Sequence, residues 1–315
     1  MKIIILGGCG YIGSVLTDIL LEKKNKIKII DNQWFGKNIN SHKHLKIVKK
    51  DIRNLRKEDF KGYDAIIHLA NIANDPSVLL KPDLSWDVNV LATMKICELA
   101  IETKIKKIIF SSSGSVYGVS NKKNVVEETD LKPISIYNKT KMIAERVFLS
   151  YSKYLDTTII RPATVCGLSR RLRLDVSVNM LTYQAYKNNL ITVLGGSQIR
   201  PNVHIIDLCN IFIHFLSKKN SSHYNKIYNA GFENLSILDI AKKIKAKTNC
   251  EIQINPSNDP RSYRLNSDKL LNSGFKRKYS VESAIEQLIY FFERKKFKAS
   301  DKNFNIKTTQ QLNVK

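Results

Sequence analysis

Several features that would place this chain in particular classes of protein are scarce or missing. No apolar run approaches the ~20 residues of a membrane-spanning helix. The apolar stretch before Leu6-Gly7-Gly8-Cys9 is also shorter than the roughly 7–15 residues of a signal peptide's core. Cysteines are few and widely separated, which favours reduced thiols and a cytoplasmic location, and none has a spacing typical of metal ligands. The five are Cys9, Cys97, Cys166, Cys209 and Cys250. We therefore expect no metal and no membrane insertion.

Acidic residues are in short supply. The chain has 28 Asp and Glu against 52 Lys and Arg, a formal charge of +24. Most of the excess is lysine, spread over every segment together with abundant isoleucine and asparagine, the pattern that AT-rich coding produces. Aromatic residues are not interleaved with the basic runs, as binding of single-stranded nucleic acid would require. We expect no nucleic-acid partner, although a diffuse positive field attracts anionic substrates.

Glycines are also few, yet three of them fall at the start in a regular pattern. The apolar run Ile3–Leu6 predicts a buried parallel strand, and helical spacing of apolar residues begins directly after the glycines. Strand, glycine loop and helix in this order form a dinucleotide fingerprint: Gly7 permits the turn, Gly10 admits a pyrophosphate, and Gly13 lets the helix pack on the strand. An ordinary glycine-rich turn is the alternative. The residues of this loop expected to contact a dinucleotide are Gly7, Gly10, Tyr11, Ile12 and Gly13.

Carboxylates follow the next two predicted strands. Asp31 ends the second strand, about twenty residues beyond the glycine loop, where a carboxylate binds the adenosine ribose and repels a 2′-phosphate. This favours NAD over NADP, with Asn32 beside it. Asp51 and Ile52 follow the third strand and are candidates for contacts to the adenine edge. The fingerprint is thus supported at both ends, and NAD is the predicted cofactor.

A serine-rich run at 111–118 precedes Tyr137-Asn138-Lys139-Thr140-Lys141. Tyr137 and Lys141, four apart on a predicted helix, share a face, so the ammonium can approach the phenol. Together with an oxidised nicotinamide, it is expected to lower the pKa of Tyr137 from about 10 by several units. Tyr137 would then accept a proton at neutral pH while a serine hydroxyl holds the alcohol.

Apolar strands alternate with helical stretches through about residue 160, which predicts an α/β fold with a Rossmann-like, doubly wound parallel sheet and a smaller C-terminal substrate-binding cap. Expected strands are 2–6, 27–31, 45–49, 64–69, 106–111 and 157–161, and expected helices are 11–23, 82–102 and 135–152. We predict an NAD-binding domain over 1–162 and a cap region over 163–297 that returns to the sheet near 203–206 and 226–229. The last amphipathic helix begins near Val281. The polar segment 298–315 is predicted to be a flexible tail.

In combination these motifs resemble the extended short-chain dehydrogenases, specifically the NAD-dependent nucleotide-sugar epimerase/dehydratase family. The resemblance spans Met1 to about Phe297. It is carried by Gly7-x-x-Gly10-x-x-Gly13, Asp51-Ile52-Arg53, His68-Leu69-Ala70, Asn89-Val90, Ser111-Ser112-Ser113, Tyr137-x-x-x-Lys141, Arg161-Pro162 and Arg200-x-x-x-His204-x-x-Asp207. It implies that Ser113, Tyr137 and Lys141 are catalytic and that Tyr137 and Lys141 also contact the cofactor. Leu69 and Ala70 are implied to lie against the cofactor, and Asn89 is implied to anchor a helix and to belong to the shell of residues that bind the cofactor.

The resemblance also implies a nucleotide-diphosphate sugar as substrate. Asn179 and Arg200 match positions that contact the phosphates, and Thr164 stands where many members have an asparagine. Near the end of the chain, Arg261 or Arg264 takes the role of an arginine that is replaced here by Pro256. Arg170, Arg171 and Arg173 form a cluster that either clamps phosphate or lies in a solvated loop.

A homodimer is implied as well, paired through the helices near 82–102 and 135–152. The residues that would line this contact are Met94, Cys97, Ile101, Ala144, Phe148 and Tyr151. In the alternative interpretation these apolar stripes face the sheet.

Gly114 and Ser115 occupy the positions where related dehydratases have an Asp-Glu pair, so elimination is disfavoured. Oxidation and reduction at one sugar carbon remains. The leading hypothesis is a 4-epimerase acting through a 4-keto intermediate. The alternatives are a 4-dehydrogenase or 4-ketoreductase with net redox, and a non-catalytic NAD-binding or RNA-associated protein.

Overall fold

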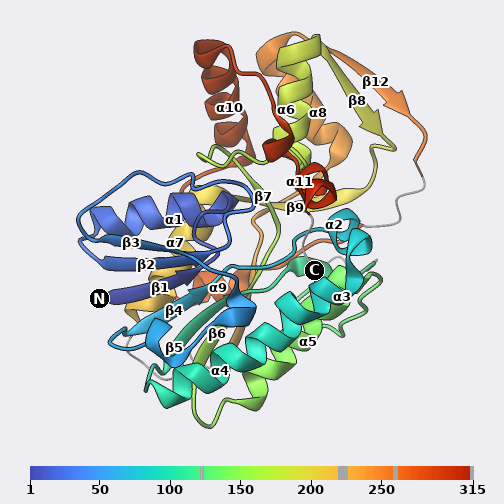
Figure 1. Ribbon diagram of the computed structural model, residues 1–315. Helices are drawn as coiled ribbons and strands as arrows, with labels where there is room; N and C mark the ends of the chain where they lie inside the picture. Colours follow the sequence, from blue (N-terminus) through green and yellow to red (C-terminus); the bar gives the residue numbers. More distant parts are fainter. Residues whose placement is uncertain (121, 123, 219–225, 258–261, 313–315) are drawn as a thin grey trace.

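A parallel β-sheet forms the centre of the computed structural model, which describes residues 1–120, 122, 124–218, 226–257 and 262–312 (Figure 1). The strands of this sheet are β1 (Lys2–Leu6), β2 (Lys26–Asp31), β3 (Leu45–Lys49), β4 (Ala65–His68), β5 (Lys107–Ser111), β6 (Asp156–Pro162) and β10 (Lys226–Ala230). Their order is β10-β6-β5-β4-β1-β2-β3, and every neighbouring pair is parallel. The predicted Rossmann-like fold is confirmed, and the first six strands begin and end within one residue of the predicted positions.

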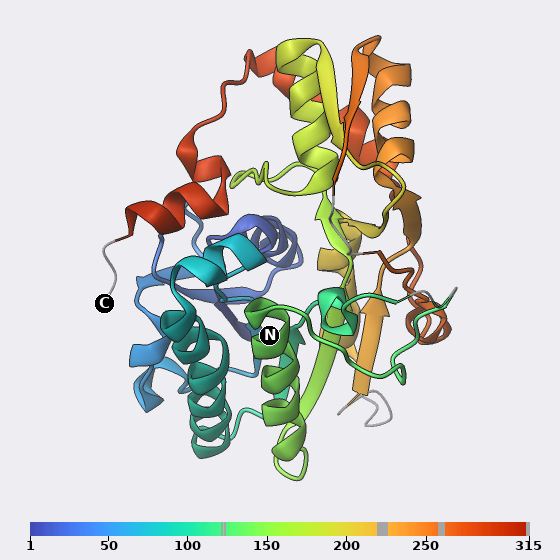
Figure 2. The same cartoon turned by 90° about the vertical axis from the view of Figure 1, so that its right-hand side faces the viewer.

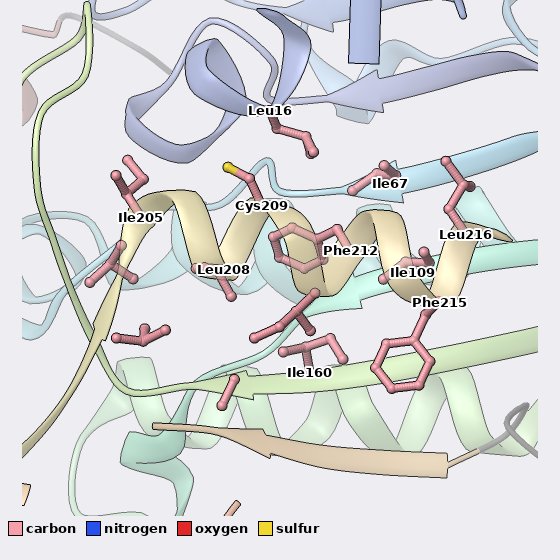
Figure 3. Close-up of a cluster of buried hydrophobic side chains, with 14 of the residues drawn as sticks. Leu16, Ile67, Ile109, Ile160, Ile205, Leu208, Cys209, Phe212, Phe215 and Leu216 are labelled. Carbon is pink, nitrogen blue, oxygen red and sulfur yellow. The ribbon is translucent and has the colours of Figure 1, made fainter. Parts of the chain in front are cut away.

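Both faces of the sheet are buried, which explains why its strands are continuous apolar runs. In β1, Ile3 and Ile5 pack into the core on one face, while Ile4 and Leu6 pack into the core on the other. Helices α1 (Tyr11–Glu22) and α7 (Ile205–Ser217) cover the first face. Figure 3 shows the apolar side of α7 lying along the strands there. Residues from beyond the predicted boundary at 162 therefore complete the core on this face of the main sheet.

The second face is covered by helices α4 (Ala92–Glu102) and α5 (Ile136–Ser150). The single helix predicted over 82–102 is divided here, because a π-helical turn at Asp87–Leu91 separates α4 from α3 (Pro82–Trp86). Such turns are rare and often accompany functional sites. Here the turn carries Asn89, whose side chain binds both backbone groups of Ile72, at distances of 2.9 and 3.3 Å. Asn89 also donates to Thr140 of α5, so it anchors a helix as predicted.

The cap is a separate layer above the carboxyl ends of the strands (Figure 2). Its core contains Val178, Leu181, Ile240 and Ile285. Its elements are α6 (Ser177–Asn188), β8 (Leu190–Leu194), α8 (Ile237–Thr248), β12 (Glu251–Asn255) and α10 (Val281–Lys295). A small sheet, with the strand order β11-β9-β7, joins it to the main sheet and consists of β7 (Thr164–Cys166), β9 (Ile199–His204) and β11 (Glu233–Ser236). The remaining short helices are η1 (Ile52–Asn54), η2 (Lys57–Asp59), α2 (Asp75–Leu80), η4 (Gly114–Tyr117), α9 (Asp268–Asn272), η6 (Asp301–Asn303) and α11 (Asn305–Gln311).

The predicted return to the main sheet near 203–206 is wrong, whereas the return near 226–229 is confirmed by β10. Residues 199–204 form β9, which pairs with β7 and β11. Helix α7 then begins at Ile205, capped by the His204 side chain, which accepts a hydrogen bond from the Ile206 amide. Residues 203–206 therefore cover the end of β9 and the start of α7, and they form no strand of the main sheet.

The predicted flexible tail is also wrong for the described residues 298–312. Helix α11 packs against α2, and Asn305, Thr308 and Thr309 are buried. Asn303 binds the loop between β7 and α6 (residues 167–176), called the cap loop below, through two hydrogen bonds. Its backbone carbonyl accepts from the Leu174 amide at 2.8 Å, and its side-chain amide donates to the Leu172 carbonyl at 2.9 Å. The segment is held mainly by polar side chains that bind distant backbone groups. Its composition is therefore as polar as that of a solvated tail, which explains the wrong prediction.

Three of the six residues assigned to a dimer contact are inside the protein. Cys97, Ala144 and Phe148 have no exposed surface and belong to the core beneath α4 and α5. The interpretation that these stripes face the sheet is the right one for them. Met94 is 40% exposed.

A buried ion pair supports the end of β5. Arg161 binds Glu145 through two parallel hydrogen bonds of 2.9 and 2.7 Å, and both side chains are at most 3% exposed. Ser112 donates to the same carboxylate, and Arg161 also donates to Tyr117 and to the Glu127 carbonyl. This pair fixes α5 relative to the serine-rich segment.

We expect Glu145→Leu to lower the free energy of unfolding by about 3–5 kcal/mol, because it leaves the Arg161 guanidinium buried and unpaired. The double variant Glu145→Leu/Arg161→Met should recover much of this loss. Chemical denaturation of the three proteins measures both effects. If the free energy of unfolding of Glu145→Leu lies within roughly 1 kcal/mol of that of the unmodified protein, the expectation is contradicted.

Candidate active site

The predicted site residues gather at the carboxyl ends of β1, β4 and β5, where doubly wound sheets bind ligands. Two adjoining hollows lie there, and both are lined by Leu69 and Asn71. The first, of about 260 Å³, contains among others Ser113, Tyr137, Lys141, Thr164, Arg173, Arg200 and Tyr263. The second contains Gly7, Gly10, Asp31, Asn32, Asp51, Ile52, Leu69 and Ala70. The catalytic candidates and the cofactor candidates thus occupy neighbouring parts of one cleft.

The glycine loop has the geometry that its pattern predicts. Gly7 has a φ of +83°, and a Cβ there would lie 2.6 Å from the Ala70 nitrogen. At Gly13 a Cβ would lie 2.5 Å from the Gly7 carbonyl oxygen, so the helix could not pack as closely. The nearest atom to a Cβ at Gly10 is 3.4 Å away, which leaves that side of the loop open toward a ligand. The first amides of α1, from Tyr11 onward, lack intrahelical partners and can receive a diphosphate. The loop therefore fits a dinucleotide.

Asp31 is fixed by the backbone at the ribose end of this hollow. Its two carboxylate oxygens accept hydrogen bonds from the Cys9 amide at 2.9 Å and the Gln33 amide at 2.6 Å. Burial raises the pKa of Asp31 despite these hydrogen bonds. Asp51 caps the following turn and pairs with Arg53. Both carboxylates line the hollow, as the motif predicts.

Tyr137 and Ser113 meet in the larger hollow. Helix α5 starts at Ile136 with Ser135 as its cap, which places Tyr137 in the first turn, facing the end of β5. Both side chains line this hollow, and the Ser113 hydroxyl acts to lower the pKa of the Tyr137 phenol. The Ser113 hydroxyl lies 2.7 Å from the Ser115 hydroxyl. A chain of three hydroxyls therefore lines the cavity.

Lys141 lies one turn further along α5 but does not bind the phenol. Its ammonium donates to the Ser111 carbonyl at 2.7 Å and lies 4.8 Å from the centre of the Phe110 ring. Burial lowers the pKa of Lys141 to about 7, although the charge of Glu145 opposes the shift. Lys141 and Tyr137 share one face of α5, as predicted, but the ammonium of Lys141 binds the end of β5 and not the phenol of Tyr137.

In the protein without a bound nicotinamide the phenol of Tyr137 is not acidic, so a pKa lowered by Lys141 together with nicotinamide stays a prediction. Burial raises the pKa of Tyr137, and neither the charge of Arg173 nor the hydrogen bond with Ser113 offsets it. A lowered pKa of Tyr137 therefore requires more positive charge near the phenol than Arg173 supplies.

The residues assigned to the substrate separate into three groups. Thr164 and Arg200 line the larger hollow. Asn179 is fully buried. Its side-chain oxygen accepts from the Gly167 amide, and its side-chain nitrogen donates to the Arg173 carbonyl and the Tyr11 hydroxyl. Asn179 therefore links the cap loop to α1 instead of facing a substrate. Arg264 is exposed outside both hollows, and Arg261 lies outside the described residues.

Arg173 and Tyr263 are among the residues of the larger hollow that were not assigned to the site from the sequence. Arg173 reaches the cavity while bound to Asp175 at 2.6 Å, and its charge acts on Tyr137. The sequence feature that could have indicated a role for Arg173 is its position in a cluster of three arginines, since arginine is scarce in this chain. Tyr263 is buried and lines the same hollow.

A further hollow of about 450 Å³ adjoins the first and shares Thr164 and Arg200 with it. Its other walls combine apolar side chains with two glutamine amides. They include Met180, Leu181, Gln184, Gln198 and Ile237. Within the described residues no cluster of potential metal ligands is found, and no helix there has the length and apolarity to cross a membrane.

The sequence model of the NAD dependent epimerase/dehydratase family matches residues 3–231. This is most of the chain, and it includes the glycine loop, Tyr137 and Lys141. The chain belongs to the NAD-dependent epimerase/dehydratase family. It is accordingly an enzyme rather than a non-catalytic member of the fold.

Individual members of this family are distant in sequence. A UDP-glucose 4-epimerase of Lactobacillus helveticus is 28% identical over 276 residues, which cover 78% of this chain and 82% of that protein. A putative UDP-glucose 4-epimerase of Methanocaldococcus jannaschii is 30% identical, covering 69% of this chain and 74% of its own. A UDP-glucuronic acid decarboxylase of Danio rerio is 25% identical, covering 93% and 73%.

Solved structures of family members share the fold. The UDP-glucose 4-epimerase of Thermotoga maritima, determined with UDP-glucose, superposes with a TM-score of 0.85 and is 23% identical. The match covers 94% of this chain and 100% of that one.

We expect Lys141→Met to raise the free energy of unfolding of the ligand-free protein by about 1–4 kcal/mol at pH 7 while abolishing turnover. The folded pKa of about 7 lies below the ordinary 10.5, so the unfolded chain holds this proton more tightly. Protonation therefore opposes folding fully below pH ~7, and the opposition disappears as the pH rises toward ~10.5. Denaturation measured across this pH range tests the expectation.

Lys139→Met is the matched control, because Lys139 is exposed on the same helix. A Lys141→Met protein that is less stable at pH 7, or whose advantage does not change with pH, would disprove the interpretation of Lys141 as an uncompensated buried cation.

Proposed function

We propose that this enzyme is an NAD-dependent nucleotide-sugar epimerase that inverts C4 of a nucleotide-diphosphate sugar through a 4-keto intermediate. The observation that carries the proposal is that Tyr137, Ser113 and Lys141 line one cavity, which lies next to the open side of the glycine loop. A proton acceptor, a hydroxyl that holds the substrate oxygen and a dinucleotide site then meet at one place.

NAD fits the residues of the smaller hollow. Gly7, Gly10 and the first turn of α1 would hold its diphosphate, and Asp31 would bind the adenosine ribose. Asp31 already accepts two backbone hydrogen bonds, and its remaining lone pairs can accept ribose hydroxyls. When bound, the nicotinamide accepts a hydride from the substrate carbon and returns it.

In this mechanism Tyr137 removes the proton from the C4 hydroxyl and later returns it to the C4 oxygen. Ser113, which is hydrogen-bonded to Ser115 and lines the same cavity as Tyr137, would orient that oxygen and stabilise charge that develops on it. Lys141, held by the Ser111 carbonyl, supplies positive charge on the Tyr137 side of the cavity. Return of the hydride to the opposite face of the keto group gives the C4 epimer without net redox change.

Gly114 and Ser115, which follow the reacting serine, cannot supply the acid and base of an elimination. The carboxylate in the cavity wall is that of Asp75, which accepts a hydrogen bond from the Ser135 hydroxyl at the start of α5. It is thereby tied to the helix that carries Tyr137. Oxidation and reduction at one carbon is the chemistry that these side chains support.

A uridine nucleotide fits the 450 Å³ hollow beside Thr164 and Arg200. Met180 and Ile237 provide apolar surface for a flat base, while Gln184 and Gln198 carry amides that can pair with its polar edge. Arg200, shared by both hollows, is placed to contact the diphosphate. The relatives with UDP-sugar names support this choice of nucleotide.

We expect Tyr137→Phe to retain NAD binding and to lose about 10²–10⁴-fold in turnover, since it removes the proton acceptor and little volume. Isothermal titration with NAD and a coupled assay of UDP-glucose or UDP-N-acetylglucosamine conversion measure the two effects. Tyr154→Phe, at an exposed tyrosine beyond the end of α5, is the control. Turnover close to normal in Tyr137→Phe would refute the assignment.

The same assay separates epimerase from dehydrogenase or ketoreductase. An epimerase converts substrate without a lasting change in absorbance at about 340 nm, because the nicotinamide is regenerated in each cycle. Stoichiometric reduction or oxidation of added cofactor would favour the alternative with net redox.

A further inference from the structure

Arg171, in the cap loop before α6, is a buried cation with little compensation. Its side chain is packed inside the protein, with 4% of the residue exposed. One guanidinium nitrogen donates to the Asn305 side-chain oxygen at 2.5 Å, and the group lies 3.9 Å from the centre of the Phe35 ring. Its Nε has no hydrogen-bond partner among the described residues.

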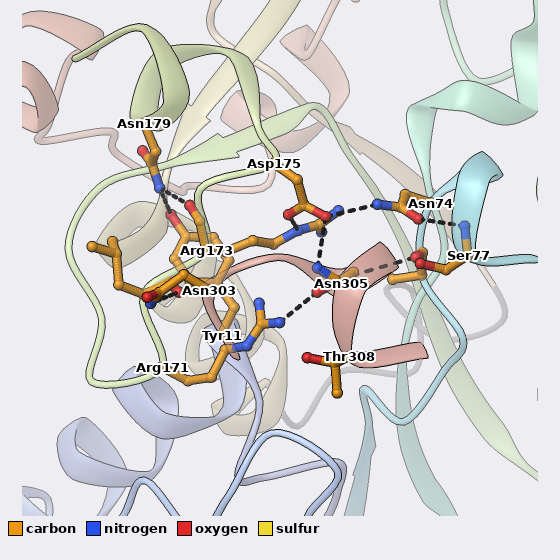
Figure 4. A network of polar contacts seen from close by, with 12 residues as sticks. Tyr11, Asn74, Ser77, Arg171, Arg173, Asp175, Asn179, Asn303, Asn305 and Thr308 are labelled. Atoms are coloured by element: carbon orange, nitrogen blue, oxygen red, sulfur yellow. Dashed lines mark hydrogen bonds and ion pairs between the residues drawn. The ribbon is translucent and has the colours of Figure 1, made fainter. Parts of the chain in front are cut away.

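Carboxylate oxygens near Arg171 are already engaged by other groups. Asp175 accepts from Arg173 at 2.6 Å, from the Asn74 side chain at 2.8 Å and from the Asn305 amide at 3.0 Å (Figure 4). Burial and the charge of Arg173 lower the pKa of Arg171 to about 9, and the charge of Asp175 opposes this. A buried cation with neutral partners is costly unless an anion joins it.

The position of Arg171 suggests which anion this is. Its charge acts on Tyr11, the first residue of α1, and Figure 4 shows the two side chains close together. Phe35, on which the guanidinium stacks, lines the same hollow as Gly7, Gly10 and Asp31. The guanidinium therefore stacks on a side chain of the cleft wall and lies close to the positive end of α1.

We propose that Arg171 binds the diphosphate of the dinucleotide cofactor through its unpaired Nε–H, and that Asn305 of the C-terminal helix is the residue that positions it. The proposal rests on NAD being the cofactor. It assigns a role both to the arginine cluster and to the C-terminal segment, which lies beyond the matched family region at residues 3–231.

The C-terminal segment forms a bridge at this point. The Asn305 side chain accepts from Arg171 and donates to the Ala73 carbonyl at 3.4 Å, so it connects the cap loop to the loop after β4. Phe35, from the loop after β2, lies on the other side of the guanidinium. Three loops are thus joined beside the diphosphate position, and we expect bound NAD to exchange slowly.

The test compares Arg171→Met with the unmodified full-length protein. Affinities for ADP and for adenosine are measured by isothermal titration, and melting temperatures are measured without ligand. We expect ADP to bind about 10- to 100-fold more weakly, because a charge-assisted hydrogen bond is lost, while the affinity for adenosine stays the same. The ligand-free variant should melt at the same temperature as the unmodified protein or higher, because an uncompensated buried charge has been removed.

Arg170→Met is the matched control. Arg170 is adjacent in sequence and pairs with Asp18 at 3.1 Å on a more exposed side of α1, so its loss removes the same charge without touching the guanidinium bound by Asn305. We expect its affinity for ADP to stay within about twofold of normal, apart from a long-range effect that salt removes.

Asn305→Ala tests the positioning role, and it also decides the matter if Arg171→Met does not fold. It should weaken ADP binding several-fold and accelerate NAD release, with adenosine unaffected. In an Arg171→Met background the same change should have no further effect on ADP affinity.

An ADP affinity of Arg171→Met and Asn305→Ala within twofold of normal would overturn the assignment, as would an equal loss of ADP and adenosine affinity. Failure of the unmodified protein to bind either ADP or NAD would instead overturn the proposed cofactor, and this assignment with it.

Discussion

Burial of the Lys141 ammonium beneath the carboxyl end of β5 is the constraint on which the site depends. The helix that carries Tyr137 must deliver this cation to the Ser111 carbonyl, and the strand must end there to receive it. Positive charge in a water-poor cavity acts strongly on a neighbouring phenol. Burial alone, however, raises the pKa of Tyr137. Burial is the larger effect in the protein alone, and a cationic nicotinamide would lower the pKa of Tyr137 and favour the phenolate.

Buried charges in this protein are of two kinds. Arg161 and Glu145 satisfy each other completely and hold α5 against the serine-rich segment. Lys141 and Arg171 are both buried; Lys141 donates to the Ser111 carbonyl and Arg171 to the Asn305 side-chain oxygen, which are neutral acceptors. The first kind gives the framework its geometry. The second stores unfavourable free energy that anionic or phenolate groups can relieve, which couples ligand binding to the stability of the site.

The parts of the fold and site that could be predicted from sequence are those determined by nearby residues. The glycine loop, Asp31 and the six strands follow from local spacing and apolar runs, so the pattern located them closely. Asn179 and the C-terminal segment could not be predicted in this way. Their side chains bind groups more than a hundred residues away, such as Tyr11 and Ala73, and no periodicity records such contacts. The direction of the Tyr137 pKa also required the depth of its burial to be known.

The most direct test of the central claim is the pKa of Tyr137 with and without oxidised NAD, measured by ultraviolet difference titration of phenolate against Tyr137→Phe as reference. In the protein alone the phenol should titrate above the ordinary value of about 10. With NAD bound, its pKa should fall by several units toward neutral pH. A pKa that stays at or above about 10 in the complex would contradict the role of Tyr137 as the proton acceptor.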